Sequence, residues 1–129
     1  MDLHNLEQVP IHLGDGQQVI PIVNFNDDYQ SYIERYCSPD VPGRLVMWAH
    51  SATDWPAWEC HPAGPEVVIA VSGKAEMIQR FPDGERRVII GPGQVIINPP
   101  GVPHTARIIE PFTAIYITPC PGTFHEPRT

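Results

Sequence analysis

The sequence predicts an all-β protein with one short helix near its N-terminus. Sixteen prolines and ten glycines interrupt the 129 residues at short intervals, and such turn residues suit short strands better than long helices. Hydrophobic residues make up 42% of the chain. That share supports one packed core, and the length fits a single domain.

The helix is expected within residues 26–37. Its larger side chains recur at the i, i+3, i+4, i+7 spacing of one helix face, at Tyr29, Tyr32, Ile33 and Tyr36. Asn26 can cap the start, and Asp27 and Asp28 favour the positive end of the helix dipole. We expect this helix to cover one end of the core.

Every element predicted after residue 43 is a strand. Segments with β-branched and aromatic residues between turn signals lie at 44–50, 57–61, 66–71, 74–81, 85–90, 94–99, 104–110 and 112–118, and one more strand is expected at 18–25. Such spacing is typical of a sandwich or barrel. The domain then has three parts: an N-terminal strand and helix in 1–43, a barrel in 44–118 and a C-terminal arm in 119–129.

Composition excludes several classes of partner. The net charge is −7, and no basic cluster exceeds Arg86-Arg87, so we expect no nucleic-acid partner. No apolar run reaches the roughly 20 residues that span a bilayer, and the N-terminus lacks the pattern of a signal peptide. These observations predict a cytoplasmic protein. Three cysteines are an odd count and do not indicate a disulfide framework.

Four side chains with metal-binding capacity lie close together in the stretch WECHPAGPE at 58–66. Alternation along a strand places Glu59 and His61 on one face and Cys60 on the other. Glu66 opens the next strand after the Pro-Ala-Gly-Pro turn. Glu59, His61 and Glu66 can therefore converge on one point inside a barrel, while Cys60 packs elsewhere.

A more distant histidine, His104, follows a strand and a proline-stiffened turn, and here the chain resembles the cupin superfamily. The second cupin motif, G-x5-P-x-G-x2-H-x3-N, is matched at Gly93, Pro99, Gly101 and His104, with Ile108 in place of its Asn. The first motif, G-x5-H-x-H-x3,4-E-x6-G, is matched at His61, Glu66 and Gly73, with Thr53 in place of its first Gly and Glu59 in place of its first His.

The resemblance implies a cupin-type double-stranded β-helix, which is a jelly-roll barrel, and a divalent metal. Cupins typically hold the metal with three His and one Glu. Here the corresponding ligands are Glu59, His61, Glu66 and His104, a set suited to Fe, Mn, Zn or Ni. Two alternatives stay open. Glu59 can turn away and leave a two-His, one-carboxylate set, or the histidines can line a metal-free pocket.

The resemblance further implies a metal-dependent enzyme, dioxygenase-like or isomerase-like, acting on a small organic molecule. Glu59, if it does not bind the metal, is the candidate catalytic base. The alternative is a non-catalytic small-molecule binding or sensor domain. Strand alternation assigns the pocket walls to Trp55, Ala57, Val68, Ala70, Ala106 and Ile108.

The remaining expectations concern the surface. Val67, Ile69 and Val71 form an apolar second face on their strand and need cover, and small cupins commonly pack sheet against sheet, so we expect a homodimer. His50 is interpreted as structural. The histidines near the chain ends are interpreted as solvated, namely His4, His12 and His125.

Overall fold

The computed structural model describes residues 3–128. Its strands are β1 (Ile11–Gly14), β2 (Val19–Pro21), β3 (Gly43–Ser51), β4 (Ala57–Cys60), β5 (Glu66–Phe81), β6 (Gly84–Ile90), β7 (Val95–Asn98), β8 (His104–Thr118) and β9 (Phe124–Pro127). One α-helix, α1 (Tyr29–Tyr36), and a 3-10 turn, η1 (Asp15–Gln17), complete the set within the described residues. The all-β prediction with one short helix is confirmed.

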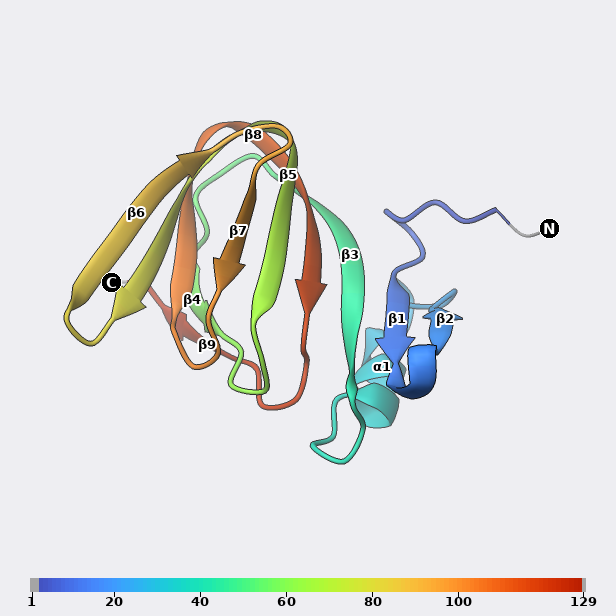
Figure 1. The fold of residues 1–129 in the computed structure, drawn as a ribbon. Helices are drawn as coiled ribbons and strands as arrows, with labels where there is room; N and C mark the ends of the chain where they lie inside the picture. Colours follow the sequence, from blue (N-terminus) through green and yellow to red (C-terminus); the bar gives the residue numbers. More distant parts are fainter. Residues whose placement is uncertain (1–2, 129) are drawn as a thin grey trace.

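The strands pair antiparallel and close into a barrel, with β1, β2 and α1 beside the outer edge of β3 (Figure 1). The order β2-β1-β3-β8-β4-β9 runs along one path, and β5 pairs with β8, β6 and β7. The two long strands β5 and β8 therefore belong to both sides of the barrel. Residues 1, 2 and 129 of the predicted three-part division lie outside the described residues, and the division itself stays a prediction.

A bend at Gly73 allows β5 to cross from one side of the barrel to the other. The register of β5 against β8 shifts between Ala70 and Ala75, and Gly73 has a φ of 79°. A Cβ at this position would clash with the carbonyl oxygen of Pro111. The segments 66–71 and 74–81, predicted as separate strands, are thus one bent strand, because glycine tolerates both the positive φ and the close contact. The predicted strands 104–110 and 112–118 likewise form one strand, β8.

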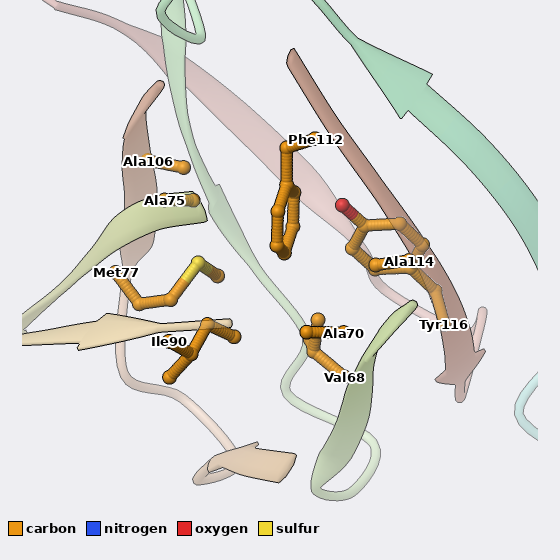
Figure 2. Packing of buried hydrophobic residues seen from close by; sticks show 9 residues of the cluster. All are labelled: Val68, Ala70, Ala75, Met77, Ile90, Ala106, Phe112, Ala114 and Tyr116. Carbon is orange, nitrogen blue, oxygen red and sulfur yellow. The ribbon is translucent and has the colours of Figure 1, made fainter. Parts of the chain in front are cut away.

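The barrel core is a cluster of nine buried side chains seen in Figure 2: Val68, Ala70, Ala75, Met77, Ile90, Ala106, Phe112, Ala114 and Tyr116. Three of them, Val68, Ala70 and Ala106, were expected to line the ligand pocket. They pack within the core instead, so that expectation is wrong. Strand alternation gives the inner face correctly but does not tell which end of the barrel is filled.

The N-terminal part is held to the barrel by an aromatic cluster around His12. This side chain is 1% exposed, its Nδ1 hydrogen-bonds with the Tyr32 hydroxyl at 3.0 Å, and its ring lies 4.3 Å from that of Tyr36. His12 is therefore not solvated as predicted, because β1, which was missed, carries it under α1. The helix cap also differs from the prediction: Asp28, not Asn26, accepts a hydrogen bond from the Ser31 amide.

A disulfide joins Cys37, at the C-terminal cap of α1, to Cys120, just after β8. The expectation of no disulfide is wrong, since an odd count only requires one cysteine to stay free. That cysteine is Cys60, which is buried and is not part of the cluster of candidate ligands. Disulfides are typical of oxidising compartments, so the bond counts against the predicted cytoplasmic location. No helix within residues 3–128 is long and apolar enough to cross a membrane.

Candidate metal centre

All four predicted ligands meet at one end of the barrel. Glu59 lies on β4, His61 follows that strand, Glu66 begins β5, and His104 begins β8. Pairing of β4 with β8 sets Glu59 opposite His104. One nitrogen or oxygen atom from each side chain lies within 4.8 Å of every other one, a spacing that a single metal ion can bridge.

The imidazoles and carboxylates point toward one another. His61 Nε2 lies 2.7 Å from Glu59 Oε1 and 3.2 Å from Glu66 Oε2. His104 Nε2 lies 3.2 Å from Glu66 Oε1 and 3.8 Å from Glu59 Oε1. His61, Glu66 and His104 are each at most 2% exposed. Glu59 therefore does not turn away from the other three side chains.

The environment of the Nε2 atoms of His61 and His104 is better explained by a bound metal than by ordinary hydrogen bonds. Both are buried, and neither makes a hydrogen bond of acceptable geometry within the described residues, although carboxylate oxygens lie nearby. Buried polar atoms are nearly always paired. Two buried imidazole nitrogens directed at the same point as two carboxylates are a donor set suited to a divalent cation.

A neighbouring hydroxyl group holds His61 in the tautomer that a metal ion requires. The Thr123 hydroxyl donates to the Pro119 carbonyl at 3.3 Å and lies 2.9 Å from His61 Nδ1. The hydroxyl oxygen therefore accepts a hydrogen bond from the Nδ1–H group of His61, which leaves Nε2 of a neutral imidazole with its lone pair free. This kind of outer contact orients metal-binding histidines.

Glu66 is fixed by a separate chain of hydrogen bonds. Asn98 Nδ2 donates to Glu66 Oε1 at 3.0 Å, and the Thr118 hydroxyl donates to Oε2 at 2.7 Å. Gln79 in turn donates to Asn98 Oδ1 at 2.9 Å. The carboxylate, which is only 2% exposed, is thus held in one direction by these hydrogen bonds.

Electrostatics couple the four groups. Burial alone would raise the pKa of both carboxyls, but interactions with His104 and His61 outweigh it, lowering the pKa of Glu66 to about 2 and that of Glu59 well below its usual range. Burial alone would lower the pKa of both histidines. Glu59 and Glu66 outweigh it, raising the pKa of His61 to about 9 and raising that of His104 as well. The negative charges of Glu59 and Glu66 therefore favour a positive charge beside them, either a proton on the imidazoles or a bound cation.

One contact to the site was missed in the sequence. His125, interpreted as a solvated residue of the C-terminal arm, has its Nε2 2.7 Å from Glu59 Oε2, although the side chain is exposed. The arm reaches the site because β9 pairs with β4, with His125 opposite Glu59. His50 is not part of the site. Its Nδ1 hydrogen-bonds with the Thr113 hydroxyl at 2.8 Å.

A cavity of about 360 Å³ opens onto Glu59, His61 and Glu66. Of the predicted wall residues only Trp55 lines it. Most other wall residues come from segments that were not predicted to line the pocket. They include Phe25, Tyr29, Tyr32 and Ile33 near α1, Leu45, Met47 and Ala49 on β3, and Tyr116 and Thr118 on β8.

Solved structures with similar folds are cupin-fold proteins. Oxalate decarboxylase from Bacillus subtilis is 21% identical over 65% of this chain and 23% of its own, with a TM-score of 0.54. Hydroxypropylphosphonic acid epoxidase from S. wedmorenis is 17% identical over 58% of this chain and 43% of its own, with a TM-score of 0.50. Hydroquinone 1,2-dioxygenase from Sphingomonas sp. TTNP3 is 14% identical over 58% of each chain, with a TM-score of 0.50.

These similarities cover less than two thirds of each of those proteins and show the fold alone. No protein-family model matches the sequence, and no curated protein matches it. The fold and the side-chain cluster together define a cupin-fold protein with a candidate metal centre of two glutamates and two histidines.

Proposed function

We propose that the protein is a metal-dependent cupin enzyme that acts on a small organic molecule. The observation that carries this proposal is the convergence of two buried Nε2 atoms and two carboxylates within 4.8 Å. Three of the structurally similar proteins are named as an epoxidase, a dioxygenase and a decarboxylase, and the epoxidase has also been described in an Fe(II) form. Dioxygenase-like or isomerase-like chemistry is the narrower form of the proposal.

Each residue has a defined part in this proposal. His61, Glu66 and His104 would hold the ion, with Glu59 as the fourth ligand. When bound, Fe, Mn, Zn or Ni would polarise substrate oxygen atoms, and iron would add redox chemistry. Glu59 is the least buried of the four side chains, at 27% side-chain exposure, and it borders the cavity. If the other three residues hold the ion without it, Glu59 is the carboxylate placed to accept a proton from a bound substrate.

The proposal is tested by metal content and turnover in matched variants. We expect about one equivalent of divalent metal per chain in protein purified without chelators, and loss of most of it in His104→Ala. His50→Ala is the control, since His50 lies outside the cluster, and it should keep the metal. Full metal retention in His104→Ala contradicts the ligand set. Metal binding with no substrate consumed in a screen of small organic acids and phenols would favour the binding or sensor alternative.

We further propose a homodimer, formed through the outer face of the β3, β8, β5 and β7 strands. Cross-strand pairing aligns two apolar rows there: Val46, Ile117, Val67 and Ile97 form one, and Trp48, Ile115, Ile69 and Val95 form the other. Ile97 is 57% exposed and Val95 54% exposed. Such contiguous apolar rows are typical of an interface.

Light scattering coupled to gel filtration tests the dimer. The expected mass is twice the 14.4 kDa of one chain. Ile97→Lys should give monomers, whereas Val88→Lys, on the β6 strand away from the two rows, should not. A wild-type protein that is monomeric at high micromolar concentration would exclude this interface.

A further inference from the structure

The cavity beside the metal centre is walled mainly by apolar side chains. Phe25 and Tyr32 contribute aromatic rings from the α1 region, Trp55 contributes another, and Leu45 and Met47 contribute aliphatic surface from β3. Its volume of about 360 Å³ lies within the range of small-molecule sites. Flat aromatic walls pack best against another ring, since stacked and edge-to-face arrangements add to the hydrophobic term.

The charges of the lining residues restrict the class of ligand further. Among residues 3–128 that line the cavity, the charged side chains are Glu59, Glu66 and the imidazole of His61, and no Lys or Arg is present. Two carboxylates would offset the charge of a divalent ion. A ligand with two negative charges would therefore find no net positive field, whereas a neutral or singly charged ligand would lose little on entry.

Most polar groups of the lining are already engaged. The Thr118 hydroxyl donates to Glu66, and the Thr123 hydroxyl hydrogen-bonds with His61. The Tyr32 hydroxyl hydrogen-bonds with His12. These groups hold the walls and the candidate ligands in place, so they are not free to select a ligand.

Among the buried hydroxyl groups of the lining, that of Tyr116 is the exception. Its side chain lines the cavity and is 8% exposed, and its buried hydroxyl has no hydrogen-bond partner in the described part of the chain. Figure 2 shows Tyr116 within the core cluster, with its hydroxyl oxygen on the side of the ring that faces Phe112. Burial first, and then the charges of Glu66 and Glu59, raise the pKa of Tyr116, so the hydroxyl stays protonated and acts as a donor. An unpaired buried donor is destabilising, and a ligand acceptor would remove that penalty.

We infer that the cavity binds a ring-bearing, neutral or singly charged chelator, one of whose oxygen atoms accepts a hydrogen bond from Tyr116. The ring would lie between the α1 segment and β3, and the adjacent oxygens would face the candidate metal ligands. This inference rests on the metal centre proposed above. It adds the ligand class and a specificity-determining residue.

Calorimetric titration of zinc-loaded protein tests the ligand class. Tropolone is a singly charged ring with two adjacent oxygens, and oxalate is a doubly charged chelator without a ring. We expect tropolone to bind at least tenfold more tightly than oxalate, with zinc retained throughout. Equal or tighter binding of oxalate would overturn the inference.

Two variants test the residues. Tyr116→Phe should keep its zinc and bind tropolone about tenfold more weakly, while the control Tyr36→Phe, outside the cavity, should match wild type. Ile33→Lys, which adds a cation at the cavity wall, should shift the preference toward oxalate. Tropolone binding by Tyr116→Phe within twofold of wild type would overturn the role of Tyr116. Zinc bound without the expected preferences overturns this inference alone, whereas failure to bind any divalent metal overturns the proposed function with it.

Discussion

The disulfide between Cys37 and Cys120 is predicted to supply a large part of the stability of the fold. The perturbation is its removal, either by a reductant or by replacing both cysteines with alanine. The bond closes a loop with a sequence separation of 83 residues, and it ties the end of α1 to the segment after β8. Without it, the unfolded chain gains the conformational freedom that the cross-link removes.

The loop length sets the magnitude. The chain-entropy relation gives about 4.5 kcal/mol at 25 °C for a loop of this size. Divided by an unfolding entropy of roughly 0.27 kcal/mol/K for a chain of this length, this corresponds to a fall in Tm of roughly 17 °C. Most of the effect lies in the unfolded state, so the barrel and the metal centre should keep their structure after reduction.

Calorimetry with and without a phosphine reductant measures this shift, and the Cys37→Ala/Cys120→Ala double variant is the control. The variant should unfold at the lower temperature and should not respond to the reductant. A thiol assay on denatured, unreduced protein should detect one thiol, that of Cys60. Three titratable thiols in freshly purified protein, or an unchanged Tm on reduction, would refute the reasoning.

Further predictions concern pH and backbone conformation. Because the pKa of His61 is raised to about 9 in the metal-free protein, its contribution to stability is complete below pH 6.5 and is lost as the pH rises through 9. Metal must displace the same proton, so zinc affinity, measured by competition with a chelating dye, should rise about tenfold per pH unit between 7 and 9. A zinc affinity that does not change between pH 7 and 9 would contradict the idea that zinc displaces a proton from His61. Gly73→Ala should destabilise the barrel by more than about 2 kcal/mol in urea unfolding, since its Cβ would meet the Pro111 carbonyl. Gly93→Ala is the control, because Gly93 has a φ of 82° but nothing within 4 Å of its Cβ. It should lower the free energy of unfolding by only about 1–2 kcal/mol. Equal losses in the two variants would show that the contact with the Pro111 carbonyl does not matter.

The sequence predicts the barrel and its four candidate ligands because their signals are local. Turn residues divide the strands, and alternation places Glu59 and His61 on one face. The spacing of the second cupin motif then predicts that His104, which is distant in the sequence, belongs to the same site. The structure brings these side chains together with Glu66, although metal binding itself stays a proposal.

What the sequence does not predict depends on pairing between distant segments. Nothing local to His125 indicates that β9 will pair with β4 and carry it to Glu59. The cavity walls from Phe25 and Tyr32, and the bond between Cys37 and Cys120, likewise arise from the placement of α1 over the barrel end. Short helices and edge strands gain their stability from tertiary contacts. The local periodicity of hydrophobic residues does not indicate which distant segments make these contacts.

Anomalous diffraction from crystals of the metal-loaded protein tests the central claim most directly. We predict one strong peak per chain, within about 2.0–2.2 Å of His61 Nε2, His104 Nε2 and a carboxylate oxygen of Glu66, with Glu59 as the fourth ligand. A peak held by other residues, or imidazole rings turned so that Nε2 no longer faces the carboxylates, would contradict the account.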